Sequence, residues 1–215
     1  MILPPAKLGL LGGGQLGRYF VMAAHELGYG VIVLDPDPDS IAGRIADEHL
    51  IASYEDEDAL MSLAGHCRAV TTEFENVPSI SLAKLEKQLP VRPGSRIVEI
   101  CQDRLLEKSF FAMQGLPHAP FAVIRCEEDI LEADAGLFPG ILKISRFGYD
   151  GKGQAVVKDR ESALDAFRSY GGALCILERK LQLEREVSMI LARDSMGNCV
   201  TYPLVENRHR EGILD

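Results

Sequence analysis

The 215-residue chain carries a formal net charge of −9 and is 47% hydrophobic. That apolar content can fill the core of one large domain or two small ones, which excludes a disordered chain. The acidic balance, with lysines and arginines scattered along the chain, argues against general binding to nucleic acids.

Cysteine usage and hydropathy narrow the class further. The five cysteines stand far apart without a CxxC pair, so neither a zinc knuckle nor a disulfide framework is encoded. The N-terminus lacks a signal-peptide pattern, and no apolar run approaches the ~20 residues of a membrane helix. We therefore expect a cytoplasmic enzyme or binding protein without a membrane partner.

The first 95 residues alternate short apolar runs with amphipathic segments. Runs rich in Val, Ile and Leu that are separated by helical patterns indicate βαβ crossovers. This alternation predicts an α/β domain with a parallel sheet over residues 1–95. The expected strands cover residues 7–12, 31–35, 48–53 and 68–74, and the expected helices cover residues 15–28, 56–66 and 79–89.

A boundary is expected at the turn "RPGS", Arg92 to Ser95. A polar helix follows over residues 103–115, where Gly115 with Pro117 beyond it forms a stop signal. Residues 96–118 are therefore expected to be linking helices.

The rest of the chain is mainly strand-like, with only two helical intervals, at residues 127–135 and 161–170. This pattern predicts an antiparallel α+β region. The expected strands cover residues 121–124, 140–145, 154–158, 175–178, 183–193 and 199–205.

A glycine motif, G-x-G-x-x-G at Gly12, Gly14 and Gly17, lies between the first strand and the first helix, and Asp35 ends the next strand. Three interpretations are open: a dinucleotide site of a dehydrogenase, an anion site at a helix N-terminus, or a glycine that only permits close helix–strand packing. The later change to hairpins disfavours the dehydrogenase, whose sheet should continue to alternate with helices.

Two lysines form the next group of candidate functional residues. Lys108 lies one helical turn from Arg104 on the polar helix, although such a charged face is usually just solvated. Lys143 interrupts an apolar strand, where a lysine needs an anionic partner. A phosphate and a carboxylate explain Lys143 equally well.

The glycine-rich stretch "FGYDGKGQ", Phe147 to Gln154, follows that strand. Its backbone amides suit a phosphate, and a hairpin turn is the plainer interpretation. Further on, Glu178 ends one apolar strand and Glu186 begins another. Two acids placed in this way can flank a segment that holds an adenine nucleotide.

In this order the pieces resemble the ATP-grasp ligases, and among them the synthetases that carboxylate aminoimidazole ribonucleotide in purine biosynthesis. The resemblance rests on "GGGQLGRYF", "TTEFENVP", "RPGSRIVEICQDRLLEKSFF", "GYDGKGQ", "LERKL…EREVS" and "YPLVENRHREGIL", and it spans Gly12 to Leu214. It implies an N-terminal, Rossmann-like pre-ATP-grasp domain, an α+β ATP-grasp lid over residues 119–178, and the start of a C-terminal grasp subdomain over residues 179–215. Because the chain stops soon after "EGIL", we expect that subdomain to be incomplete and the chain to be inactive alone.

The resemblance also implies the chemistry. ATP phosphorylates bicarbonate to carboxyphosphate, and the exocyclic amine of aminoimidazole ribonucleotide takes up the carboxyl group. Positioning and charge neutralisation lower such a barrier, without a protein nucleophile. Mg²⁺ is implied with ligands beyond the end of this chain, so no metal ligand is assigned, and a homodimer is expected.

Site residues follow from the same resemblance. They comprise Lys108 and Lys143 at the ATP phosphates, Glu178, Lys180 and Leu181 at the adenine hinge, Glu186 at the ribose, and His209 in the same nucleotide site; Tyr149, Asp150 and Lys152 as catalytic residues; and Gly14, Gln15, Leu16 and Glu73 at the nucleotide substrate. Two alternatives remain beside this assignment: a formate-dependent purine transformylase, and a non-catalytic nucleotide-binding module.

Overall fold

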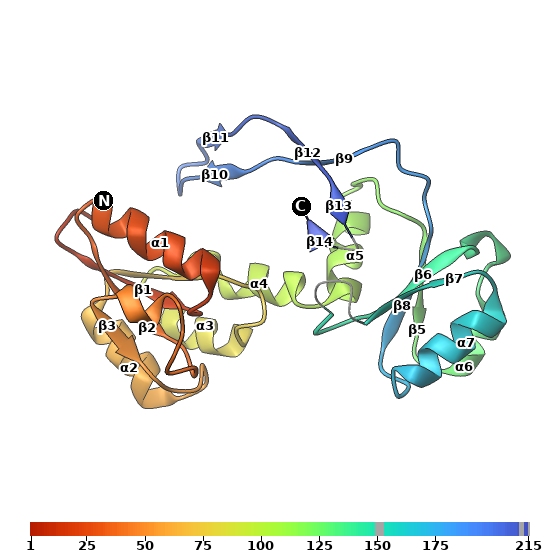
Figure 1. The fold of residues 1–215 in the computed structure, drawn as a ribbon, viewed down its shortest axis with the longest axis horizontal. Coiled ribbons are helices and arrows are strands. Elements are labelled where there is room, and N and C mark those ends of the chain that lie inside the picture. The colour runs from red at the N-terminus through yellow and green to blue at the C-terminus, as the bar shows by residue number, and fades with distance from the viewer. Residues whose placement is uncertain (149–152, 211–212, 215) are drawn as a thin grey trace. The chain divides into compact units, whose positions relative to one another are not determined.

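The computed structural model describes residues 1–148, 153–210 and 213–214. The chain divides into two compact units, Met1–Phe110 and Phe111–Asp215, whose elements are labelled in Figure 1. None of the helices in the described ranges is long and apolar enough to cross a membrane.

The first unit is built on a parallel sheet, as the alternating pattern predicts. Its strands are β1 (Lys7–Leu11), β2 (Gly30–Leu34), β3 (Glu48–Leu50) and β4 (Ala69–Thr72). They follow the order β3-β2-β1-β4, and all neighbouring pairs are parallel. Runs of Val, Ile and Leu suit this sheet because both of its faces are buried.

Each face of this sheet has its own cluster of buried side chains, because successive strand residues point to opposite sides. The helices are α1 (Gln15–Glu26), α2 (Glu57–His66), α3 (Ser79–Glu86), α4 (Ser95–Cys101) and the 3-10 helix η1 (Gly43–Ile45). Leu10 and Val33 pack with Val21 of α1, whereas Leu34 joins Leu63 of α2 in the larger cluster. Figure 1 shows α1 on one side of the sheet and α2 and α3 on the other.

The helix α5 (Arg104–Met113) contains the division between the units, and the second unit continues with an antiparallel sheet, as predicted. Its elements are β5 (Phe121–Ile124), α6 (Glu127–Glu132), the 3-10 helix η2 (Ala135–Leu137), β6 (Gly140–Ile144), β7 (Gln154–Val157), α7 (Arg160–Ser169) and β8 (Cys175–Arg179). In the described ranges the strand order is β5-β8-β6-β7. Helices α6 and α7 cover one face, where Ile130 and Phe167 share a core with Leu142 and Leu177 (Figure 1).

Residues after β8 form short antiparallel pairs. They are β9 (Glu186–Ser188), β10 (Leu191–Arg193), β11 (Cys199–Thr201), β12 (Val205–Asn207), β13 (His209–Arg210) and β14 (Ile213–Leu214). The prediction of single strands over residues 183–193 and 199–205 is wrong, because each stretch contributes to two different pairs, β9 with β12 and β10 with β11. Pro203, which has no N–H donor, lies where the second stretch divides.

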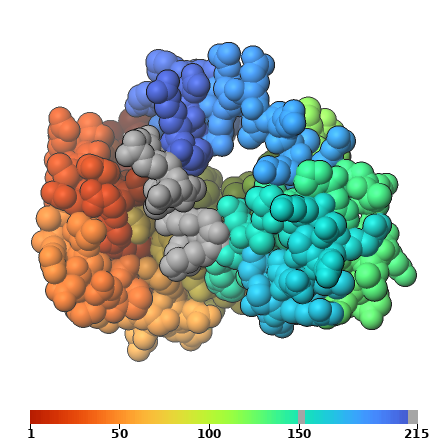
Figure 2. Space-filling model, turned by 45° about the vertical axis from the view of Figure 1, so that its right-hand side comes forward, coloured from red at the N-terminus to blue at the C-terminus, as the bar shows by residue number. Residues whose placement is uncertain are grey.

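These terminal pairs bury little of their apolar surface. No residue after Glu178 is buried in the ranges that the structure describes. Met189, Ile190 and Tyr202 are each more than half exposed, and this segment, in blue in Figure 2, lies at the molecular surface.

Asp47 connects the last turn of α1 to the start of β2. Its Oδ2 accepts a hydrogen bond of 2.7 Å from the Val31 amide and lies 2.9 Å from Nε2 of His25. The bond from Val31 first, and then the one to His25, hold the pKa of Asp47 below its ordinary value. The ionised carboxylate is therefore the form that stabilises the fold.

Asp47→Asn is expected to lower the free energy of unfolding at neutral pH, because an amide does not replace both charge-assisted hydrogen bonds. A folded-state pKa below the unfolded value of about 4 means that the contribution is complete above about pH 4 and is lost as the pH falls through the folded value. Urea denaturation should therefore give a stability difference at neutral pH that shrinks in acid.

Asp39→Asn is the matched control for this prediction. It removes an exposed carboxylate that lies 2.9 Å from an Arg44 nitrogen, and such surface pairs contribute little to stability. A difference between Asp47→Asn and the parent chain that grows as the pH falls would contradict the prediction.

Candidate functional site

The glycine loop between β1 and α1 is held by carboxylates from the two neighbouring strands. The Gly14 and Gly17 amides donate to the two oxygens of Glu73, at 2.7 and 2.6 Å. The Gly13 amide donates to Oδ2 of Asp35 at 2.6 Å. Helix α1 begins at a glycine cap without a side chain, so these carboxylates satisfy amides that its N-terminus leaves free.

Glycine is required here because the carboxylates approach the backbone closely. A Cβ atom at Gly14 would lie 2.5 Å from Oε1 of Glu73, and one at Gly13 would lie 2.5 Å from Oγ of Ser40. The motif therefore lets the chain bind its own acids. The helix N-terminus thus binds an anion, which is an internal carboxylate. Gly17 also permits close helix–strand packing, because a Cβ there would lie 3.1 Å from Leu10 of β1.

A cavity of about 300 Å³ opens beside this loop, at the carboxyl ends of the parallel strands. Its described lining comprises Gly13, Gly14, Asp35, Asp37, Ser40, Ile41, Tyr54, Glu73 and Phe74. This lining includes carboxylates but neither lysine nor arginine. Such a cavity favours a ligand's hydroxyl or amino groups over its phosphate.

The structure brings two of the expected substrate residues, Gly14 and Glu73, together in this cavity. Gln15 and Leu16 follow in the first turn of α1, exposed and outside the lining. Asp35 and Tyr54 are cavity residues that the sequence assigned to no site. The sequence pointed to Asp35 only through its position at the end of the strand that follows the glycine motif.

In the second unit, Lys143 and Glu178 form an ion pair on the sheet face opposite the helices. Nζ of Lys143 lies 2.8 Å from Oε2 of Glu178, and the side chains are 18% and 8% exposed. Lys143 pairs in register with Ile176, two positions before Glu178, so both side chains project from the same face. A carboxylate is thus the anionic partner that the apolar strand required.

The expected adenine hinge includes Glu178 and continues directly after it. The Arg179 and Lys180 amides donate to the carbonyls of Pro120 and Pro139, both at 2.9 Å, which fixes the exit of the chain from β8. A cavity of about 590 Å³ adjoins the segment and is lined by Phe138, Pro139, Arg179, Lys180, Leu181 and Gln182. Lys180 and Leu181 therefore lie at one cavity, next in sequence to Glu178.

Glu186 on β9 and His209 on β13, both expected at the nucleotide, lie close together. Nε2 of His209 is 3.6 Å from Oε1 of Glu186. Asn207, which pairs in register with Glu186, donates to that same oxygen at 3.1 Å and to Oγ of Ser188 at 2.7 Å. Sequence reasoning missed Asn207, because only the pairing of β9 with β12 places it there.

The other expected residues are Lys108, Tyr149, Asp150 and Lys152. Lys108 lies on α5 in the first unit, whereas Lys143 belongs to the second. Tyr149, Asp150 and Lys152 lie outside the described residues. In the described ranges, no group of three or more His, Cys, Asp or Glu side chains could hold a metal ion.

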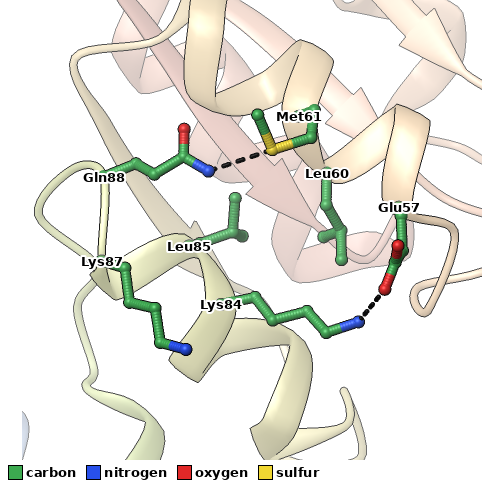
Figure 3. A pocket seen from close by; sticks show the side chains of 7 residues that line it. All are labelled: Glu57, Leu60, Met61, Lys84, Leu85, Lys87 and Gln88. Atoms are coloured by element: carbon green, nitrogen blue, oxygen red, sulfur yellow. Dashed lines mark hydrogen bonds and ion pairs between the residues drawn. The ribbon is translucent and has the colours of Figure 1, made fainter.

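A further groove of about 250 Å³ lies between α2 and α3, away from the predicted site residues (Figure 3). The Lys84 ammonium lies 2.5 Å from a Glu57 oxygen, and the Gln88 amide donates to Sδ of Met61 at 3.0 Å. Its polar groups are thus paired with one another over an apolar floor that includes Leu85. We assign it no role.

Two family models match the chain, one after the other. Residues 5–102 match the ribonucleotide synthetase preATP-grasp domain, and residues 109–215 match the ATP-grasp domain. The first match falls on the unit with the parallel sheet, and the second falls mainly on the unit with the antiparallel sheet. The chain belongs to the ATP-grasp family, so the dehydrogenase interpretation does not hold.

Several similar proteins are N5-carboxyaminoimidazole ribonucleotide synthetases. N5-carboxyaminoimidazole ribonucleotide synthase of Brucella melitensis is 42% identical over 98% of this chain, which spans 59% of that relative. The Staphylococcus aureus N5-carboxyaminoimidazole synthetase solved with ADP has a TM-score of 0.94 at 34% identity, covering 99% of this chain and 57% of its own.

The Aspergillus clavatus N5-carboxyaminoimidazole synthase, solved with ADP and aminoimidazole ribonucleotide, has a TM-score of 0.86 at 25% identity. This match covers 97% of this chain and 55% of that chain. The chain thus spans somewhat more than half the length of each of these proteins.

Gly14→Ala is expected to destabilise the chain by about 1–3 kcal/mol, because the new Cβ displaces Glu73 and leaves two amides unbonded. Gly65→Ala is the matched control: this glycine lies in α2 with nothing within 4 Å of the added Cβ. There the change should be neutral or stabilise by up to about 1 kcal/mol, since alanine favours helix. Thermal unfolding of both variants measures the contrast, and equal effects would refute it.

Proposed function

We propose that the chain provides the nucleotide-binding parts of an ATP-dependent carbon–nitrogen ligase that carboxylates 5-aminoimidazole ribonucleotide with bicarbonate. The reaction proceeds through carboxyphosphate and gives N5-carboxyaminoimidazole ribonucleotide. The observation that carries the proposal is the likeness, over almost the whole chain, to a synthase solved with ADP and aminoimidazole ribonucleotide.

ATP binding is proposed for the second unit. The Lys143 ammonium, held by Glu178, is a point charge ready for a phosphate. The hinge residues Lys180 and Leu181 line the cavity proposed for adenine. Glu186 accepts hydrogen bonds from the ribose hydroxyls, and Asn207 and His209 both lie close to its Oε1.

Lys108 is proposed to reach the ATP phosphates as well.

Mg²⁺ normally takes one or two carboxylates beside the ATP phosphates. The residues that the structure describes offer no cluster of ligands for it. We therefore derive no step of the mechanism through the metal.

Substrate binding is proposed at the glycine loop of the first unit, with Gly14, Gln15, Leu16 and Glu73. The carboxylates of this cavity accept hydrogen bonds, so the hydroxyl and amino groups of the nucleotide suit it better than the phosphate does. Glu73 keeps its place through the amides of α1, and the loop is held ready before the substrate arrives.

Tyr149, Asp150 and Lys152 are proposed to contact bicarbonate and the reacting amine. They stand in a segment flanked by Gly148 and Gly153, and glycines let such a segment close over the reactants and open again. Closure would exclude water from carboxyphosphate and so prevent its hydrolysis.

The organisation of the enzyme completes the proposal. Residues 1–95 act as the pre-ATP-grasp domain, 96–118 as linking helices, 119–178 as the lid and 179–215 as the start of the C-terminal subdomain. We place the enzyme in the cytoplasm as a homodimer that acts on small molecules with Mg²⁺, and not on nucleic acid or membranes.

Lys143→Met is expected to weaken Mg-ATP binding about 10- to 100-fold, because a charge-assisted bond to phosphate is worth roughly 1.5–3 kcal/mol. Isothermal titration measures the affinity, with NAD as a ligand that should not bind. Lys158→Met, which removes an exposed lysine just after β7, is the matched control and should leave the affinity unchanged. If the two variants lose Mg-ATP affinity equally, Lys143 does not bind the phosphates.

With the rest of the C-terminal grasp subdomain added to this chain, bicarbonate, and not formate, is expected to stimulate ATP hydrolysis in the presence of aminoimidazole ribonucleotide, because carboxyphosphate forms from bicarbonate. Phosphate release is the measurement. Stimulation by formate instead would identify a transformylase of the formate-dependent type. ATP binding without hydrolysis, even at high magnesium, would favour a non-catalytic nucleotide-binding module.

A further inference from the structure

Tyr54 makes a hydrogen bond to Asp35 that the glycine motif does not predict. It follows β3, an edge strand, and its hydroxyl donates to Oδ2 of Asp35 at 2.7 Å. That same oxygen accepts the Gly13 amide at 2.6 Å, while the other Asp35 oxygen accepts the Asp37 amide at 2.8 Å. Asp35 is only 8% exposed, so its carboxylate is held by three donors in a nearly buried place.

The ring of Tyr54 contacts a residue that follows the strand at the other end of the sheet order. It packs against Phe74, which follows β4, with ring centroids 5.9 Å apart and planes tilted by 60°. Strands β2 and β1 lie between β3 and β4. Tyr54 and Phe74 together therefore connect the segments that follow β3 and β4.

Through these contacts Tyr54 links the two acids of the glycine loop. Its hydroxyl fixes Asp35, and its ring supports Phe74, the neighbour of Glu73. Burial, followed by the bond to Asp35 and the nearby acids, raises the pKa of Tyr54. The hydroxyl thus stays protonated and continues to donate.

We infer that Tyr54 is a positioning residue for the nucleotide substrate. It holds the Asp35 and Glu73 turns at a fixed separation, and this sets both the width of the cavity and the place of the Gly13 and Gly14 amides. The identity of the ligand rests on the proposed function. The link between Tyr54 and the glycine loop does not.

Tyr54→Phe removes the hydroxyl and keeps the ring, so it tests the link directly. Tyr29→Phe is the matched control, because it removes a tyrosine hydroxyl that donates to the Ile2 carbonyl at 3.0 Å in the same unit. The measurements are the backbone amide NMR signals of Gly13, Gly14 and Gly17, and isothermal titrations with aminoimidazole ribonucleotide and with Mg-ATP.

Tyr54→Phe should shift all three amide signals and weaken aminoimidazole ribonucleotide binding roughly tenfold, the fold-change of one charge-assisted hydrogen bond. ATP affinity should not change, because the ATP groups tested belong to the second unit. Tyr29→Phe should leave both affinities and the three signals unchanged. General destabilisation would not weaken the binding of aminoimidazole ribonucleotide while leaving the affinity for Mg-ATP unchanged.

The inference is overturned if Tyr54→Phe shifts only the Gly13 signal, or if it weakens the binding of both ligands equally. If the parent chain does not bind aminoimidazole ribonucleotide, only the proposed function is contradicted. The amide signals then decide the role of Tyr54. Should Tyr54→Phe not fold, Phe74→Leu removes the ring contact and keeps the hydroxyl. It should shift Gly14 and Gly17 more than Gly13, and the reverse order would refute the link.

Discussion

Helix α1 depends on two acids that come from elsewhere in the sequence. A helix leaves its first amides without partners, and the glycines that begin α1 have no side chain with which to bond them. Glu73 and Asp35 fill this place from the ends of β4 and β2, on either side of β1. One set of hydrogen bonds thus links the position of α1, the order of the strands and the lining of the cavity. Breaking one of these bonds therefore affects the others.

The second unit solves a similar electrostatic problem with a pair of opposite charges. Lys143 lies in an apolar strand, where an unpaired ammonium would be costly, and Glu178 neutralises it from the neighbouring strand. A phosphate that arrives here meets a lysine already in place, and it must share or take over the ammonium from Glu178. The ion pair therefore keeps Lys143 ordered and also limits how tightly a phosphate is bound in the ground state.

The sequence predicts the regular parts of the fold because their patterns are local. Alternating apolar runs located β1 to β4, and the lysine in "GILKIS" was correctly expected to need an anion. Its partner Glu178, 35 residues away, and the contact of Glu73 with amides more than 50 residues earlier depend on sheet register. After residue 183 each expected strand divides into two, β9 with β10 and β11 with β12. A strand-like pattern does not reveal which residues will pair.

The glycine motif shows why a spacing alone does not define a ligand. In a dinucleotide site the amides after the first strand stay free for a pyrophosphate, and the cavity must tolerate its charge. Here the Gly13, Gly14 and Gly17 amides are already bonded at 2.6 to 2.7 Å to acids of the chain itself. The glycine loop therefore yields a cavity of opposite polarity, lined by acceptors, in which a phosphate would be repelled and a hydroxyl or amine retained. What distinguishes the two sites is the presence of Glu73 after β4, a residue outside the motif.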